Sequence, residues 1–143
     1  MGDNYRLSIC SIRGLVQKHG YIIESGGKTL ESSVSSIEFA INLKKDLLSV
    51  LVKGLRSVKP WLQHDDMLYV EIPNQHLANW LNGRVEYKDY VEELDKVFEI
   101  LETIDCRYKF MFVNSPYARE VVKNTKLFLN EGSSLIESFK DLN

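Results

Sequence analysis

The hydrophobic and polar positions along the chain follow two different periods. In the first part, runs of β-branched and aromatic residues separated by turn signals predict three strands, at residues 5–12, 20–25 and 28–36. From Ile37 to Leu55 the apolar residues recur at helical spacing, and Ser35 or Ser36 could cap that helix. We therefore expect an antiparallel meander of three strands followed by a long helix.

The second part of the chain alternates between the two periods. The apolar run at 67–72 predicts a strand buried on both faces, and Arg107 to Val113 predicts a final strand. Helical spacing predicts three more helices, at 75–83, at 87–101 and from Ser115-Pro116 to the "EGSS" segment. The order β-β-β-α-β-α-α-β-α predicts an α/β fold, a mixed five-stranded sheet with helices packed on its faces.

Length and charge limit the classes of protein to consider. The chain has 143 residues, enough for one domain, and we expect this domain at 1–130 and a short amphipathic tail at 131–143. The net charge of -2 argues against a surface built throughout to neutralise phosphates, although a local basic patch is compatible with it. No stretch fits a signal peptide or a membrane span, and Cys10 and Cys106 read as free thiols, so we expect an intracellular protein of the cytoplasm or nucleus.

Three segments carry a resemblance to the ribonuclease H-like family. "PNQHLANWLNG" resembles the family's "DSQ-x-V-x-NWLNG", and "SSIEFAINLKKDLL" resembles its "N-x-x-x-E-x-x-A-L-x-x-A-L" first helix. "SPYAREVV" is similar to its closing "N-x-x-A-D-x-L-A" helix, and the match spans Tyr5 to Leu129. The resemblance implies a sheet in the order 3-2-1-4-5.

Active members of this family are two-metal nucleases, in which four carboxylates hold two Mg²⁺ ions that activate water and stabilise the leaving oxygen. Carried over by the motifs, the carboxylate of the first helix falls on Glu38, which is present. The aspartate of the fourth strand falls on Pro73, which has no side-chain ligand atom, and that of the last helix falls on Arg119, which has the opposite charge. The resemblance therefore implies a site that has lost ligands.

The fourth ligand position, on the first strand, is also without a carboxylate, because none occurs between Asp3 and Glu24. Glu71 precedes Pro73 by two residues, so on a strand it points to the same face but lies about 7 Å further back. Glu38 and Glu71 are the remnant candidates for catalysis, and compensation by such neighbours is not expected.

Five residues are candidates for binding. Lys45, Lys53 and Arg56 could form a basic stripe on the first long helix together with Lys59, and the alternative is an ordinary solvated face. Arg119 would bring a positive charge to the former metal site. Trp80 could offer apolar area to a partner, and its default role is core packing.

The favoured hypothesis is a non-catalytic ribonuclease H-like module that binds protein, nucleic acid or both within a larger assembly. It predicts no enzymatic activity, no cofactor and a protein partner, with nucleic acid as a possible second partner and no membrane. One alternative is a divergent Mg²⁺-dependent nuclease acting on RNA/DNA hybrid or structured nucleic acid. Another is a small α/β inhibitor or docking protein, since a fold alone does not choose among functions.

Overall fold

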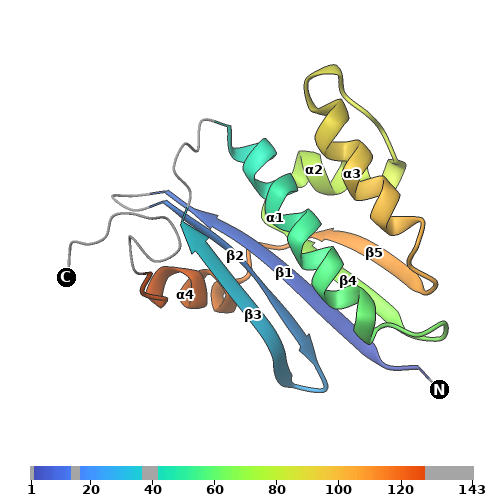
Figure 1. The fold of residues 1–143 in the computed structure, drawn as a ribbon, viewed down its shortest axis with the longest axis horizontal. Coiled ribbons are helices and arrows are strands. Elements are labelled where there is room, and N and C mark those ends of the chain that lie inside the picture. The colour runs from blue at the N-terminus through green and yellow to red at the C-terminus, as the bar shows by residue number, and fades with distance from the viewer. Residues whose placement is uncertain (1, 14–16, 37–41, 128–143) are drawn as a thin grey trace.

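The computed structural model describes residues 2–13, 17–36 and 42–127 (Figure 1). In this part of the chain one sheet is formed by β1 (Asn4–Ile12), β2 (Lys18–Ser25), β3 (Lys28–Ser36), β4 (Met67–Ile72) and β5 (Arg107–Phe112). Its helices are α1 (Leu43–Val58), α2 (Gln75–Gly83), α3 (Val91–Leu101) and α4 (Pro116–Asn124), with 3₁₀ turns at Lys59–Trp61 and Lys88–Tyr90. The strand order is β3-β2-β1-β4-β5, with β1, β2 and β3 antiparallel and β1, β4 and β5 parallel. The predicted mixed sheet and its order are confirmed.

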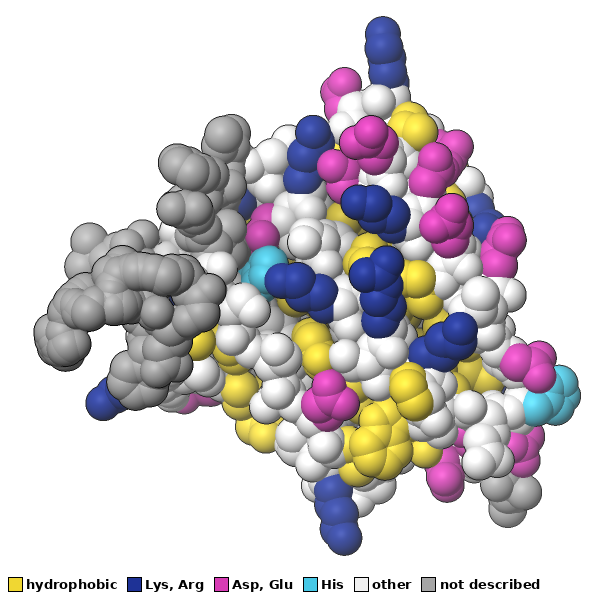
Figure 2. All heavy atoms as spheres, in the orientation of Figure 1, with side chains coloured by type: hydrophobic (Ala, Val, Ile, Leu, Met, Phe, Trp, Pro, Cys, Tyr) yellow, Lys and Arg dark blue, Asp and Glu magenta, His cyan; other side chains and the backbone are white. Residues whose placement is uncertain are grey.

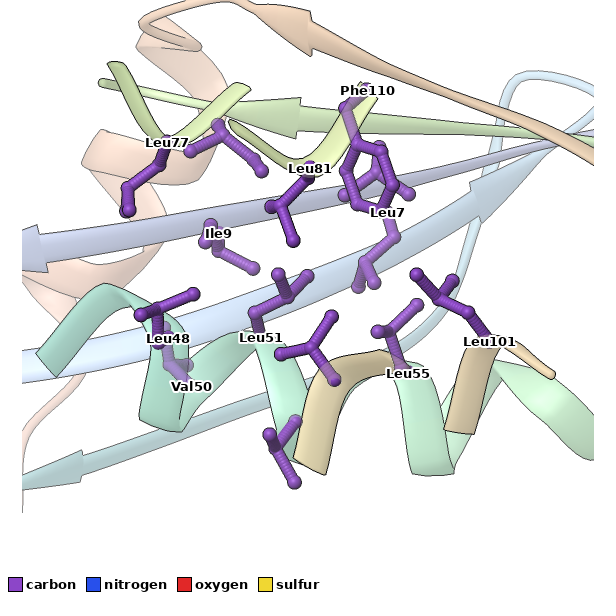
Figure 3. Close-up of a cluster of buried hydrophobic side chains, with 14 of the residues drawn as sticks. Leu7, Ile9, Leu48, Val50, Leu51, Leu55, Leu77, Leu81, Leu101 and Phe110 are labelled. Carbon is purple, nitrogen blue, oxygen red and sulfur yellow. The ribbon is translucent and has the colours of Figure 1, made fainter. Parts of the chain in front are cut away.

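Helices cover both faces of the sheet, as predicted: α1, α2 and α3 lie on one face and α4 on the other (Figure 1). The larger core lies under α1, where side chains from β1, α1, α2, α3 and β5 point toward one another (Figure 3). A smaller core between the sheet and α4 consists of Cys10, Ile22, Ala118 and Val122. Burial along β4 alternates between buried and half-buried, so the expectation of a strand buried on both faces is wrong. The half-buried side of β4 lies on the α4 face, because α4 packs on β1 and β2 instead.

One glycine sets how closely α1 approaches the sheet. A Cβ atom added at Gly54 would lie 2.8 Å from Cδ1 of Leu7, a fully buried residue of β1. The packed core leaves the Leu7 side chain no room to move away from such a methyl group. Glycine, which has only a hydrogen in place of the Cβ, therefore allows α1 to pack closely against β1.

The first helix begins later than predicted. Asn42 caps α1, because its side chain accepts a hydrogen bond from the backbone N–H of Lys45 at 3.2 Å. Ser35 and Ser36, the predicted caps, instead belong to β3. The apolar residues from 37 to 41, which continued the helical spacing, lie outside the described residues.

The last helix ends earlier than predicted. Thr125 is extended and follows the last helical residue, Asn124. The Nζ of Lys18 donates to the backbone oxygens of Lys123 and Thr125, at 2.8 and 2.9 Å. The carboxyl end of a helix carries partial negative charge, so the ammonium group of Lys18 stabilises the end of α4. The same two hydrogen bonds link α4 to β2. The predicted tail at 131–143 lies outside the described residues.

The side chain of Asn82 forms hydrogen bonds with backbone groups at the outer edge of β5. Its side chain donates to the backbone oxygen of Phe110 at 2.8 Å and accepts from the backbone N–H of the same residue at 3.1 Å. The side-chain amide thus takes the place of a neighbouring strand at this edge position.

No helix among the described residues is long and apolar enough to cross a membrane.

Candidate functional site at the carboxyl edge of the sheet

The parallel pairing of β1 and β4 defines the edge where the resemblance places a metal site. Ser8 pairs with Glu71, and continuing this register by two residues sets Cys10 beside Pro73. Cys10 is buried and Pro73 half-buried. Near the carboxyl edge, β1 therefore carries a thiol, two residues before its end, and β4 is followed by a pyrrolidine ring; neither group is a ligand for Mg²⁺.

Arg119 brings a positive charge to the same edge. It lies on α4, which begins at the Ser115 cap and packs on β1 and β2, and its side chain is exposed. Burial raises the pKa of the Cys10 thiol, and the charge of Arg119 partly offsets this rise, so the guanidinium lies close enough to act on the end of β1. Among the described residues the guanidinium of Arg119 has no hydrogen-bond or ion-pair partner, while its backbone N–H donates to the backbone oxygen of Ser115 within α4.

Glu71, one remnant candidate, is engaged with side chains of β1. Its Oε1 accepts a hydrogen bond from Ser8 at 3.0 Å, and its Oε2 lies 3.6 Å from Nε of Arg6. Arg6 also lies 3.6 Å from Glu24. The Glu71 side chain is only 12% exposed. It therefore belongs to a small ionic group on the α4 face of the sheet, behind the edge.

Glu38, the other remnant candidate, lies outside the described residues. The start of α1 points to a different carboxylate for this helix. Asn42 and Asp46 stand four residues apart, at the spacing of Asn and Glu in the family's "N-x-x-x-E" motif, and Asn42 is the helix cap. This spacing makes Asp46 a second candidate, beside Glu38, for the carboxylate of the first helix.

Asp46 is the centre of a buried polar network. Its Oδ1 lies 2.8 Å from Nδ1 of His19, and its Oδ2 accepts from Oγ of Ser11 at 2.5 Å. On the far side of the ring, Nζ of Lys53 lies 3.0 Å from Nε2 of His19. A lysine ammonium can only donate, so Nε2 is the acceptor and the proton of a neutral His19 sits on Nδ1, facing Asp46.

The hydrogen bonds of this network stabilise a buried negative charge. Burial would raise the pKa of Asp46, but the hydrogen bonds from His19 and Ser11, with the charge of Arg13, hold it below its ordinary value. Each oxygen of the carboxylate already has one hydrogen-bond partner, so a metal ion would compete with His19 and Ser11 for the remaining lone pairs. Ser11 contacts the carboxylate and not the imidazole, so the network is not an activated nucleophile.

Among the described residues, no three His, Cys, Asp or Glu side chains come together in a way that could hold a metal ion. The edge offers chemistry of another kind. The thiol of Cys10 is buried, and the exposed group is a guanidinium, whose planar set of donors fits a phosphate or a carboxylate.

Lys45, Lys53 and Arg56, predicted as a stripe, do lie together. They line one side of a hollow of about 350 Å³ between α1 and α3. This surface is on the opposite face of the sheet from α4 and Arg119. The predicted binding residues thus belong to two separate surfaces.

Trp80 occupies the core position that was its default role. Its side chain is 9% exposed and stacks on Tyr87 with 3.9 Å between ring centroids. The ring centroid of Tyr90 lies 5.5 Å from that of Trp80, and Nζ of Lys44 lies 5.5 Å from the centroid of the Trp80 ring. With its ring covered in this way, Trp80 has little area left for a partner.

The sequence-based prediction missed the network around Asp46. No sequence pattern singled out His19, which is a buried residue of β2 paired with Ser11 of β1. One signal was available: the Asn-to-Asp spacing of "NLKKD" matches the family motif as well as any segment that contains Glu38.

By sequence, no family model and no curated protein matches the chain. Solved structures do match its fold. RNase H1 from the halophilic archaeon Halobacterium salinarum NRC-1 is 15% identical, with a TM-score of 0.65 over 83% of this chain and 93% of that one. The N-terminal RNase H domain of Rv2228c from Mycobacterium tuberculosis is 14% identical, with a TM-score of 0.66 over 86% and 93%. LC11-RNase H1 in complex with RNA/DNA hybrid is also 14% identical, with a TM-score of 0.65 over 83% and 94%. At these identities the likeness shows the fold, which is ribonuclease H-like.

Proposed function

We propose that this ribonuclease H-like domain works by binding protein or nucleic acid within a larger assembly, and that it does not cut nucleic acid. The observation that carries the proposal is the make-up of the carboxyl edge. Pro73 and the exposed Arg119 stand where the resemblance places two metal-binding aspartates, and β1 carries the thiol of Cys10 near its carboxyl end. Two-metal chemistry needs oxygen ligands in near-octahedral geometry, which this set of side chains does not supply.

The two carboxylates nearest to the edge support the same conclusion. Glu71 accepts from Ser8 and lies beside Arg6, and Asp46 accepts from His19 and Ser11. Turning either side chain away from these partners, toward a metal ion at the edge, would break hydrogen bonds in a largely buried position.

The exposed guanidinium of Arg119 is the binding group that we assign to this edge. A positive charge there attracts phosphate or carboxylate groups, and the flat guanidinium can bond either through two parallel N–H groups. The solved structures of similar fold include a ribonuclease H1 bound to RNA/DNA hybrid, which supports nucleic acid as one class of partner.

Charge reversal at Arg119 tests this role. We expect Arg119→Glu to weaken binding of an RNA/DNA hybrid at least ~10-fold, with a melting temperature close to that of the unaltered protein. Lys28→Glu is the matched control, because it makes the same charge change at the hairpin that joins β2 to β3, at the opposite end of the sheet. A lower melting temperature with unchanged affinity would instead assign Arg119 to a structural ion pair and overturn the proposal.

A divergent nuclease is the second candidate, and the retained carboxylate of Asp46 is the observation that favours it. In such an enzyme a metal ion would share the Asp46 carboxylate with the hydrogen bonds from His19 and Ser11. Metal-dependent cleavage separates the two candidates.

A further inference from the structure

The hollow between α1 and α3 gathers positive charge on a chain that is acidic overall. Its wall on α1 carries Lys45, Lys53 and Arg56, and its wall on α3 carries Lys96 and the single acidic residue, Glu93. Figure 2 shows Lys and Arg side chains gathered over α1, with hydrophobic atoms visible between them. We call these five residues, with Ser49 between them, the α1/α3 groove.

The four cations of the groove are available to a ligand. Their side chains belong to exposed residues, and none of them forms an ion pair with a carboxylate of another described residue. Like charges held side by side repel one another, so an anion that bridges them relieves an unfavourable arrangement as it binds.

One of these cations is positioned by buried groups. Nζ of Lys53 is held at 3.0 Å by His19, whose side chain is only 7% exposed and is itself fixed by Asp46. This contact reduces the freedom of an otherwise flexible side chain before a ligand arrives. The contact uses one of the three N–H donors of the Lys53 ammonium, which leaves the others for a ligand in the groove.

The groups that line the groove indicate the chemistry of the ligand. Lysine and arginine side chains only donate hydrogen bonds, Ser49 can donate, and Glu93 is the only carboxylate among the lining residues. The floor is formed by buried positions, Leu48 and Val52, which leave little apolar area for a side-chain anchor. A bound peptide would bring its own N–H donors, for which this lining has few acceptors. The backbone of DNA offers acceptors alone.

The length of the groove fits a strand of nucleic acid. From Lys45 to Arg56 the helix rises about 16 Å, at about 1.5 Å per residue. A strand of DNA carries a charge about every 3.4 Å along its axis, so several phosphates lie within reach of four cations. No aromatic residue lines the groove, so it offers no surface on which bases could stack.

We propose that the α1/α3 groove is a binding site for the phosphate backbone of nucleic acid, and that it contacts the strand without regard to base sequence. The site lies on the opposite face of the sheet from Arg119, so it goes beyond the role assigned to the carboxyl edge. It would hold whether or not the domain cuts nucleic acid, and Arg119→Glu leaves it unchanged.

The test measures binding of a fluorescein-labelled single-stranded DNA of 12 nucleotides and mixed sequence, by anisotropy, in EDTA and over a range of salt. We expect the double variant Lys45→Glu/Arg56→Glu to bind at least ~10-fold more weakly. Its affinity should also depend less steeply on salt, by about 0.7 in the log–log slope for each phosphate that the variant no longer neutralises. Lys53→Gln, which removes a charge and leaves His19 and Asp46 in place, should weaken binding about threefold or more.

The matched control is Lys28→Glu/Lys109→Glu, which makes the same charge change at exposed residues away from the groove. We expect its affinity to change by less than about threefold, and melting curves establish that each variant is folded. An equal loss in the control, an unchanged salt slope in the groove variant, or no binding by the unaltered protein would overturn the proposal. An oligoglutamate peptide that competes as well as unlabelled DNA of equal charge would also overturn it, in favour of an acidic protein partner.

Discussion

Replacing Asp46 by asparagine should destabilise the fold by an amount that can be worked out from its contacts. The carboxylate is buried and accepts hydrogen bonds from His19 at 2.8 Å and from Ser11 at 2.5 Å. Asparagine has nearly the same shape: its oxygen can accept from His19 and its NH₂ can donate to Ser11, so both contacts survive without the negative charge. A hydrogen bond to a charged group contributes ~1.5–3 kcal/mol and a neutral one ~1 kcal/mol. The expected loss in free energy of unfolding is therefore about 1–4 kcal/mol.

The pH dependence of this loss provides a second check. The pKa of Asp46 is lower in the folded protein than in the unfolded chain. Its charge therefore contributes stability that is fully present above the unfolded pKa, near ~4, and that is lost as pH falls through the lower folded pKa. The difference in stability between the unaltered protein and Asp46→Asn should be largest near neutral pH and shrink below pH ~4.

Urea unfolding of both proteins, followed by tryptophan fluorescence between pH 7 and pH 3.5, measures both effects. Asp105→Asn is the matched control, because the Asp105 side chain is 87% exposed and its contact with His64 is correspondingly weak. The control should change stability by less than ~0.5 kcal/mol. If Asp46→Asn were no more destabilising than Asp105→Asn at pH 7, the reasoning that assigns the network its energy would be wrong.

Three further predictions concern packing, the sheet edge and the thiols. Gly54→Ala should lower the free energy of unfolding by ~1–3 kcal/mol in urea titrations, although alanine is the better helix former, because the added methyl meets a buried leucine of β1. Asn82→Ala should cost ~1–3 kcal/mol by the same assay and raise aggregation measured by light scattering, since it frees the backbone groups of Phe110 at a sheet edge. Iodoacetamide should modify the half-buried Cys106 of the native protein before the buried Cys10, and mass spectrometry after unfolding should show that both are free thiols.

The sheet could be predicted from the sequence because its information is local and repeated. Each strand carries its own run of apolar residues, and a meander followed by crossovers leaves few possible topologies. The start of α1 could not be predicted by periodicity, because apolar residues at 37–41 keep the helical spacing. What fixes the start is one hydrogen bond, from the backbone of Lys45 to the side chain of Asn42.

The candidate site also has one part that could be predicted from the sequence and one part that could not. The absence of a carboxylate at Pro73 and at Arg119 was visible in the sequence because each residue lies inside a short motif. The network around Asp46 was not, because it depends on the register that pairs Ser11 with His19 and on the packing of α1 across them. A shift of β2 by one residue would turn His19 to the other face of the sheet and leave Ser11 in place, and no local pattern reports that register.

Cleavage of an RNA/DNA hybrid is the measurement that tests the central claim most directly. Labelled hybrid is incubated with the protein in Mg²⁺ or Mn²⁺ at millimolar concentration, with EDTA as the control, and the products are resolved by electrophoresis. A binding domain without a metal centre predicts retarded but intact hybrid and no difference between metal and EDTA. Cleavage that requires metal and disappears in Glu38→Gln or in a folded Asp46→Asn variant would contradict the account and establish a nuclease.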